Sequence, residues 1–341
     1  MKIVNIEITH EEIPLKKPFI TALRRVDNVE FVRVKVQCDS GLFAYGEAPA
    51  TKAITGEDLD DIQNSLELIK PRLLLKSIDE ALEILHASSI GTSAKASLDM
   101  AFVSILGEKN NQKLFTYLGG SMLSFLQTDI TISLNNQRKM LQDSIDAYND
   151  KCEILKIKLG SDIDHAIAVT HDIAKSLPDA KLLIDANQAW NFDKTTKFIE
   201  AMKDISIELI EQPVPAKEID SLKKITQLSH IPILADEAAF SLEDVRYIIQ
   251  TQSADMINIK LMKCAGVTKA VEILEYAKEH KVYCMLGSML EGPYSINVAL
   301  HLAVAYKDVI RYIDLDSPLL YRDKVNDLDF EFDHSYIRLK E

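Results

Sequence analysis

Short apolar segments recur along the second part of the chain and alternate with polar stretches. Stretches such as NFDKTTKFIEAMKDI place apolar residues three or four positions apart, which is the spacing of an amphipathic helix. Strands that alternate with helices pair in parallel, so eight such units predict a (β/α)8-type barrel. The strand-like segments span 128–134, 153–159, 181–186, 207–212, 231–236, 255–261, 282–287 and 309–316.

The first part of the chain has a different pattern. Residues 1–48 contain strand-like runs joined by a CDSG turn, and residues 57–110 contain amphipathic helical stretches. Strand-like alternation returns after Pro318 in FEFDHSYIRLK. We therefore predict an α+β capping domain over residues 1–122, rejoined by the tail 318–341, and a barrel domain over residues 123–317.

Composition limits the partners of the protein. The 39 basic and 52 acidic residues give a net charge of −13, which argues against nucleic acid and anionic membranes as partners. The scattered cysteines form no CxxC pair, which indicates packing residues in a reducing cytoplasm rather than disulfides or zinc ligands. We expect a cytoplasmic protein without a membrane span and, because such barrels often associate, a homo-oligomer. The four cysteines are Cys38, Cys152, Cys264 and Cys284.

Ionisable residues recur at the ends of the predicted strands. Active sites of such barrels lie at the C-terminal ends of the strands, so these side chains should form a ring around one mouth. The strand-end residues are Lys156, Lys158, Asp185, Glu211, Asp236, Lys260, Asp314 and Asp316.

Three carboxylates in this ring follow consecutive strands. Asp185, Glu211 and Asp236 suit one Mg²⁺ per subunit, because Mg²⁺ prefers oxygen ligands and keeps positions open for water or substrate. No histidine lies at these strand ends, which counts against zinc. Each acid taken alone could instead cap the following helix.

Lysines flank the three carboxylates in strand order. Lys158 and Lys260 should face each other across the barrel, an arrangement that suits proton transfer on two faces of one carbon. The cation would stabilise the enediolate that forms when a proton leaves the carbon next to a carboxylate. A basic lysine must be neutral, and the like charge of Lys156 should lower the pKa of Lys158.

Together these motifs resemble the enolase superfamily, muconate-lactonising-enzyme subgroup, and within it the dipeptide epimerases of the L-Ala-D/L-Glu type. The resemblance covers nearly the whole chain and implies a (β/α)7β modified TIM barrel with an N-terminal α+β capping domain. It implies catalytic roles for Lys158 and Lys260, substrate binding by Lys156 and a Mg²⁺ site. The matching motifs are Lys156-Ile-Lys158, IDANQAW with Asp185, ELIEQP with Glu211, LADEA with Asp236 and NIKLMKCAG with Lys260.

The last predicted barrel strand carries the motif that separates dipeptide epimerases from their relatives. In these enzymes an Asp-x-Asp holds the free α-ammonium group of the substrate, and here it reads Asp314-Leu315-Asp316. Two carboxylates on one strand face need a cation, since an uncompensated buried charge is costly. A capping or salt-bridged pair is the structural alternative.

The resemblance also implies substrate contacts outside the strand ends. Arg24, in a loop that resembles the mobile loop of the family, matches an arginine associated with acidic side chains. A solvated surface arginine, or a pocket role for the adjacent Arg25, is the alternative. Ser288 and Met289 should lie near the substrate. One departure is the pair Ala265-Gly266, where the family commonly has two glycines.

Three functions are compatible with this ring of ionisable residues. The first is Mg²⁺-dependent epimerisation at the C-terminal residue of an L-Ala-X dipeptide, such as L-Ala-D/L-Glu from cell-wall peptide recycling. The second is another reaction on the same scaffold: o-succinylbenzoate synthesis, N-acylamino-acid racemisation or cycloisomerisation. The third is a non-catalytic binding protein in which the charged ring only holds a metal or ligand.

Overall fold

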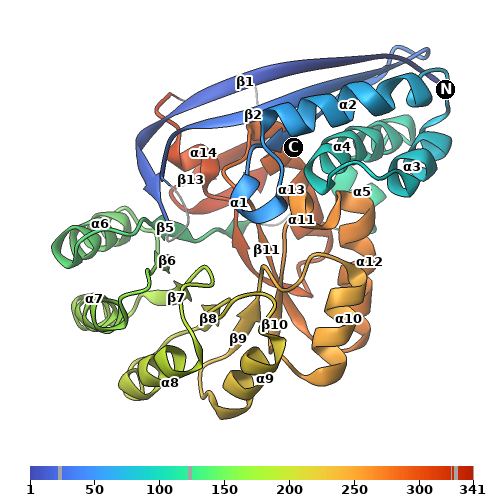
Figure 1. Cartoon of the computed structure of the whole chain (residues 1–341). Coiled ribbons are helices and arrows are strands. Elements are labelled where there is room, and N and C mark those ends of the chain that lie inside the picture. The colour runs from blue at the N-terminus through green and yellow to red at the C-terminus, as the bar shows by residue number, and fades with distance from the viewer. Residues whose placement is uncertain (22–24, 122–124, 324, 326–328, 341) are drawn as a thin grey trace.

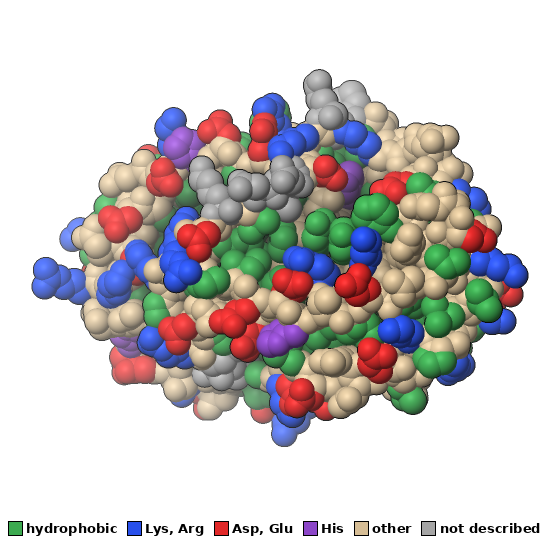
Figure 2. Space-filling model, turned by 90° about the horizontal axis from the view of Figure 1, so that it is seen from above, with side chains coloured by type: hydrophobic (Ala, Val, Ile, Leu, Met, Phe, Trp, Pro, Cys, Tyr) green, Lys and Arg blue, Asp and Glu red, His purple; other side chains and the backbone are tan. Residues whose placement is uncertain are grey.

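The computed structural model describes residues 1–21, 25–121, 125–323, 325 and 329–340. An antiparallel sheet and several helices form one layer, which lies across one end of a barrel (Figure 1). No helix in the described ranges has the length and apolarity that a membrane crossing requires. On the face seen in Figure 2, acidic and basic side chains are interspersed.

The capping layer is built from three antiparallel strands and the helices that follow them. Strand β2 pairs with β1 on one side and β3 on the other. Alternate residues of β2, namely Val32, Val34 and Val36, are buried against the helices, which is the expected pattern of a sheet with one covered face. The elements are β1 (Ile3–Ile20), β2 (Arg25–Cys38), β3 (Phe43–Pro49), α1 (Lys52–Thr55), α2 (Leu59–Leu73), α3 (Ile78–Ala87), α4 (Thr92–Lys109) and α5 (Leu114–Tyr117).

The barrel contains eight parallel strands in sequence order, which confirms all eight predicted strands, each shorter than predicted at one or both ends. An isolated parallel bridge between Thr128 and Ile313 brings the first strand next to the last and nearly closes the barrel. The strands are β5 (Ile130–Ile132), β6 (Ile154–Lys158), β7 (Lys181–Asp185), β8 (Leu209–Glu211), β9 (Ile233–Ala235), β10 (Met256–Ile259), β11 (Tyr283–Gly287) and β12 (Ile310–Asp314).

Each of the first seven barrel strands is followed by a long helix on the outside of the barrel (Figure 1). The last strand is followed only by the short helix α14 (Ser317–Leu320), so the fold is the expected (β/α)7β barrel with an N-terminal cap. A single turn, α11 (Leu261–Cys264), precedes the outer helix after β10. The outer helices are α6 (Gln137–Asn149), α7 (Ile163–Ser176), α8 (Phe192–Ala201), α9 (Ile219–Leu228), α10 (Leu242–Thr251), α12 (Val267–Glu279) and α13 (Pro293–Ala305).

The C-terminal tail contacts both parts of the protein. Tyr321 forms an isolated bridge with Leu15 of β1 in the cap. Farther on, β13 (Phe330–Asp333) and β14 (Tyr336–Leu339) form a small antiparallel sheet with β4 (Leu126–Gln127), just before the barrel. The division into residues 1–122 with the tail and 123–317 stays a prediction.

Candidate active site

The inward-facing side chains of the barrel are arranged in layers. The floor is an apolar cluster with one residue from each of seven strands, β6 to β12. Residues two apart on a strand share a face, so the next inward position of each strand lies one layer higher. That layer is polar and buried, with Gly287 as the exception. The floor is Ile154, Leu183, Leu209, Leu234, Met256, Met285 and Tyr312, and the layer above is Lys156, Asp185, Glu211, Asp236, Asn258, Gly287 and Asp314.

A cavity opens above the polar layer, between the barrel and the cap. Its barrel side includes residues that stand four positions beyond floor residues, as the same periodicity requires. Its cap side is formed by Phe19, Thr21, Ala53 and Ile54. The barrel residues that line it include Lys158, Asn187, Lys260, Ser288, Met289, Asp314 and Asp316.

Lys156 lies at the centre of the buried polar layer. Its ammonium nitrogen is 2.7 Å from a carboxylate oxygen of Asp314, 2.7 Å from one of Glu211 and 3.4 Å from one of Asp185. Burial opposes the charged form, but the surrounding carboxylates outweigh burial and raise the pKa of Lys156 well above its ordinary value. Lys156 is fully buried and is not among the residues that line the cavity.

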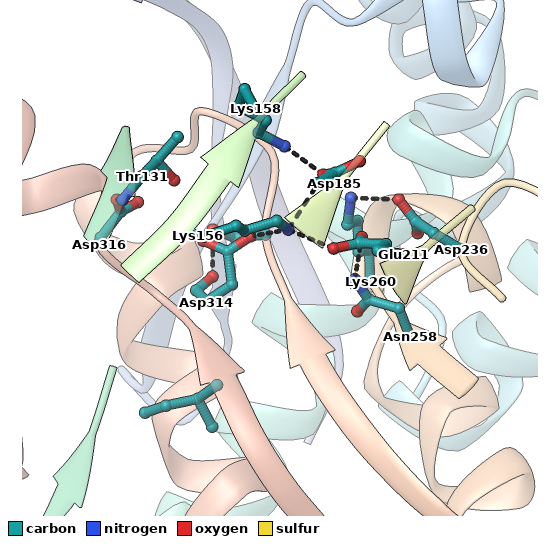
Figure 3. A network of polar contacts seen from close by, with 12 residues as sticks. Thr131, Lys156, Lys158, Asp185, Glu211, Asp236, Asn258, Lys260, Asp314 and Asp316 are labelled. Atoms are coloured by element: carbon teal, nitrogen blue, oxygen red, sulfur yellow. Dashed lines mark hydrogen bonds and ion pairs between the residues drawn. The ribbon is translucent and has the colours of Figure 1, made fainter. Parts of the chain in front are cut away.

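Lys158 and Lys260 face the cavity from opposite sides. They lie at the ends of β6 and β10, which are four strands apart in a barrel of eight. Lys158 is 2.5 Å from Asp185, and Lys260 is 2.7 Å from Asp236 (Figure 3). Although burial favours a neutral amine, the carboxylates of Asp236 and Glu211 raise the pKa of Lys260 above its ordinary value. Lys260 therefore carries its proton in this arrangement.

Asp185, Glu211 and Asp236 lie on consecutive strands between these two lysines (Figure 3). Burial alone would raise their pKa values, but Lys158 and Lys156 lower the pKa of Asp185, and Lys260 and Lys263 lower that of Asp236. Burial and the charge of Asp185 raise the pKa of Glu211 to about 7. Each of the three carboxylates is thus ion-paired with lysine here.

Asp314 and Asp316 lie across the barrel from the three carboxylates and line the cavity. Asp314 is paired with Lys156, and Asp316 accepts a hydrogen bond of 2.8 Å from the backbone N–H of Thr131. Burial and the neighbouring Asp314 raise the pKa of Asp316 to about 7. No lysine among the described residues forms an ion pair with Asp316, whose oxygen instead accepts from the backbone of Thr131.

Two family models together match most of this chain. Residues 3–119 match the mandelate racemase/muconate lactonizing enzyme N-terminal domain, and residues 139–341 match the family described as enolase C-terminal domain-like. The chain belongs to the mandelate racemase/muconate lactonizing enzyme family.

Several proteins that are similar to the chain over nearly its whole length are epimerases. The L-amino acid-D/L-Glu epimerase of Sulfurimonas denitrificans is 56% identical over 339 residues, which is 99% of either chain. The substrate-liganded structure of the L-Ala-D/L-Glu epimerase from Bacillus subtilis superimposes with a TM-score of 0.96 at 37% identity, covering 99% of this chain and 96% of that one. The dipeptide epimerase of Enterococcus faecalis, complexed with Mg and L-Leu-L-Tyr, has a TM-score of 0.95 at 30% identity and coverage of 100% and 98%.

The loop after β11 brings two residues predicted from the sequence, Ser288 and Met289, to the cavity. Ser288 donates a 2.9 Å hydrogen bond to the backbone oxygen of Asp314, which ties the loop to the neighbouring strand. The N–H of Met289 donates to Glu291 at 2.8 Å. A Cβ at Gly287 would lie 2.7 Å from Oδ1 of Asn258 and 2.9 Å from Cε of Lys260, so any larger residue would displace these two side chains.

The predicted cap arginine lies outside the described residues, since Arg24 falls in the gap between 21 and 25. Arg25 begins β2, and its guanidinium is exposed and 3.4 Å from Asp27. It is not among the residues that line the cavity, so the alternative pocket role for Arg25 is not supported.

Four polar residues of the site were absent from the sequence prediction. Lys263, on α11, is buried and lies 2.6 Å from Asp236, and Asn258 donates to Glu211 at 2.8 Å. Glu237 is buried beside Asp236, and burial together with that charge raises its pKa to about 8. Asp129 is fully buried near Asp314 and Asp316. Asn258 was detectable, because it stands two residues after a floor residue.

Proposed function

We propose that this chain is a Mg²⁺-dependent dipeptide epimerase, an isomerase that moves the α-proton of the C-terminal residue of L-Ala-X dipeptides. L-Ala-D-Glu and L-Ala-L-Glu are the expected pair. The observation that carries the proposal is the position of two lysines, Lys158 and Lys260, on opposite walls of one cavity that also contains Asp314 and Asp316. The similarity to three epimerases over almost the whole chain supports it.

The chemistry of the buried side chains fits a divalent cation. Among the described residues, seven buried carboxyl groups surround four buried lysines at this site, so carboxyl groups outnumber lysines by three. Neither oxygen of the buried Glu237 has a hydrogen-bond partner among those residues. We assign Asp185, Glu211 and Asp236 as the ligands. Bound Mg²⁺ would supply a positive charge that stabilises negative charge developing on the substrate carboxylate.

The lysines provide the two proton-transfer groups. One lysine removes the α-proton and the other returns a proton to the opposite face of the same carbon, which inverts its configuration. Lys260 is protonated when paired with Asp236, as an acid must be. Lys158 is held by Asp185 at 2.5 Å, which fixes its direction toward the cavity. Lys156 contributes positive charge below the cavity and orients Asp314.

Asp314 and Asp316 would bind the free ammonium group of the dipeptide. Both line the cavity, and Asp316 is bonded to the backbone N–H of Thr131 and to no lysine among the described residues, so an ammonium group would supply a positive charge beside it. A substrate with an N-acyl group in place of the ammonium would not supply this charge. Asp314 and Asp316 therefore favour a dipeptide over the substrates of the lyases, cycloisomerases and N-acylamino-acid racemases that have the same scaffold.

Deuterium incorporation tests the proposal. The enzyme is incubated with Mg²⁺ and a library of L-Ala-X dipeptides in D2O, and the products are analysed by mass spectrometry. We expect one deuterium at the α-carbon of the C-terminal residue, with L-Ala-L-Glu and L-Ala-D-Glu among the exchanged members. No incorporation into any member contradicts the proposal and also favours the non-catalytic alternative.

The Asp316→Asn variant separates the proposal from a reaction on an N-acylated or cyclic substrate. An epimerase should lose dipeptide affinity in this variant, whereas an enzyme with no ammonium group to bind should change little. We further propose that Arg24 favours an acidic side chain at the epimerised position, and that the enzyme is a cytoplasmic homo-oligomer whose substrates come from cell-wall peptides.

A further inference from the structure

Asp129 is a buried carboxylate with no assigned role, and it lies beside the two aspartates of the last barrel strand. One carboxylate oxygen each from Asp129, Asp314 and Asp316 lies within 4.8 Å of the others. Asp129 is completely buried, and neither of its oxygens has a hydrogen-bond partner among the residues that the structure describes. Burying a carboxylate without a partner is costly, so Asp129 needs either a bound proton or a nearby cation to offset this cost.

The closing seam of the barrel fixes Asp129 in this place. Thr128 and Ile313 form the bridge that joins the first strand to the last. The backbone N–H of Asp129 donates to the oxygen of Ile313 at 3.1 Å, and the hydroxyl of Thr128 accepts from the N–H of Leu315 at 2.8 Å. These bonds hold the backbone of Asp129 against the strand that carries the Asp-x-Asp motif.

The three carboxylates have too little positive charge around them. Lys156 contacts Asp314 at 2.7 Å, but the same ammonium also contacts Glu211 at 2.7 Å. Burial and the charge of Asp314 raise the pKa of Asp129 well above its ordinary value, in spite of the opposing charge of Lys156. The cluster opens to the cavity only through Asp314 and Asp316, because Asp129 is not among the lining residues.

We propose that Asp129 is a positioning residue of the ammonium-binding subsite, which adds a third carboxylate behind Asp314 and Asp316 and makes the subsite selective for a cationic substrate N-terminus. This inference rests on the proposed function. When an ammonium group binds, its charge favours the ionised form of Asp129. The third carboxylate then strengthens the negative potential at the cavity wall, where low dielectric makes each charge more effective. A neutral N-acyl group gains nothing from that potential.

The Asp129→Asn variant tests the role, since it keeps the size of the side chain and removes its ability to become negatively charged when the ammonium group binds. KM and kcat are measured for L-Ala-L-Glu and for N-acetyl-L-Ala-L-Glu, which lacks the charge. We expect the KM of the free dipeptide to rise about tenfold while kcat changes less than about threefold. The KM of the acetylated peptide should not rise, so discrimination between the two substrates falls about tenfold.

Asp99→Asn is the matched control, because Asp99 is equally buried but lies in the cap, where it accepts from Thr268. It should leave the discrimination unchanged. The proposal is overturned if Asp129→Asn leaves both KM values unchanged, or raises both equally as a purely structural defect would. If the wild-type enzyme exchanges no L-Ala-X dipeptide, the proposed function fails instead, so the two failures differ.

A crystal structure of the wild-type enzyme with Mg²⁺ and L-Ala-L-Glu keeps the proposal testable even if the variant does not fold. The substrate nitrogen should lie within hydrogen-bonding distance of both Asp314 and Asp316, on the side where Asp129 stands behind them. A nitrogen bound elsewhere in the cavity, or a metal ion bound by the three aspartates, would overturn the proposal.

Discussion

Glu47 joins the capping layer to the barrel next to the candidate active site. One of its carboxylate oxygens accepts from Nε and Nη2 of Arg33 at 2.9 and 2.8 Å. The other accepts from the backbone N–H groups of Tyr294 and Ser295 at 2.8 and 3.0 Å. The N-cap residue of helix α13 is Gly292, which has no side chain that could accept from the first turn. Glu47 of the capping domain therefore takes the place of an N-cap side chain for this barrel helix.

Glu47→Gln should weaken the attachment of the cap to the barrel and lower the free energy of unfolding. The amide can accept from only one pair of donors, and its NH2 group then faces the other pair. Burial raises the pKa of Glu47, while Arg33 and the two N–H groups oppose that rise, so the charge has a cost that the variant removes. With two charge-assisted bonds lost at roughly 1.5–3 kcal/mol each, we expect a net loss of about 3 kcal/mol.

Thermal unfolding and steady-state kinetics measure both consequences. For 341 residues the entropy of unfolding is roughly 0.7 kcal/mol/K, so a loss of about 3 kcal/mol lowers Tm by about 4 °C. The KM for L-Ala-L-Glu should also rise, because α13 begins directly after the loop that carries Ser288 and Met289. Ser77→Ala is the control: it removes the side-chain cap of α3, away from the cavity, and should lower Tm by less than half as much with KM unchanged.

A change in Tm below 1 °C for Glu47→Gln would refute the view that this carboxylate attaches the cap to the barrel. A full drop in Tm with an unchanged KM would refute its role in holding the loop.

Three further predictions concern single side chains. His301 accepts from the N–H of Phe115 through Nδ1, and burial lowers its pKa to about 4. As the pH falls, the unfolded chain binds a proton at His301 before the folded protein does, so the free energy of unfolding should decrease between pH 6.5 and 4. Measured by urea unfolding, this decrease should be about 3 kcal/mol larger in the wild type than in His301→Gln. Equal decreases in the two proteins would contradict this. Gly287→Ala should lower kcat at least tenfold by displacing Lys260, with little loss of Tm. Ala265→Gly should raise stability by about 1 kcal/mol, because Ala265 has φ of 68°; a destabilised variant in thermal unfolding would refute the strain.

Much of the site followed from the two-residue period of the strands. Apolar floor residues alternate with inward-facing polar ones, so Lys156 and Asp185 were recognisable as buried charges in apolar segments. The same period places Lys158 and Lys260 one layer above the buried polar layer, where they line the cavity. All eight barrel strands were predicted because their apolar runs are separated by stretches with a clear helical period.

The residues that escaped prediction depend on tertiary contacts rather than on local periodicity. Asp129 precedes its strand, and only barrel closure brings it beside Asp314. Lys263 lies on a single helical turn, and its ammonium nitrogen is 2.6 Å from Asp236, a contact that the period of the strands does not indicate. The like-charge repulsion expected between Lys156 and Lys158 is offset by Asp185, which contacts both. The expected pKa shift of Lys158 stays a prediction.

Isotope exchange by variants that lack one lysine tests whether Lys158 and Lys260 act on opposite faces of the α-carbon. Lys158→Ala and Lys260→Ala are each incubated with L-Ala-L-Glu and, separately, L-Ala-D-Glu in D2O with Mg²⁺. Neither variant should epimerise the dipeptide, and each should exchange the α-proton of one epimer only, with opposite preference. Exchange of both epimers by one variant, or epimerisation by either, would contradict a reaction that needs one lysine on each face.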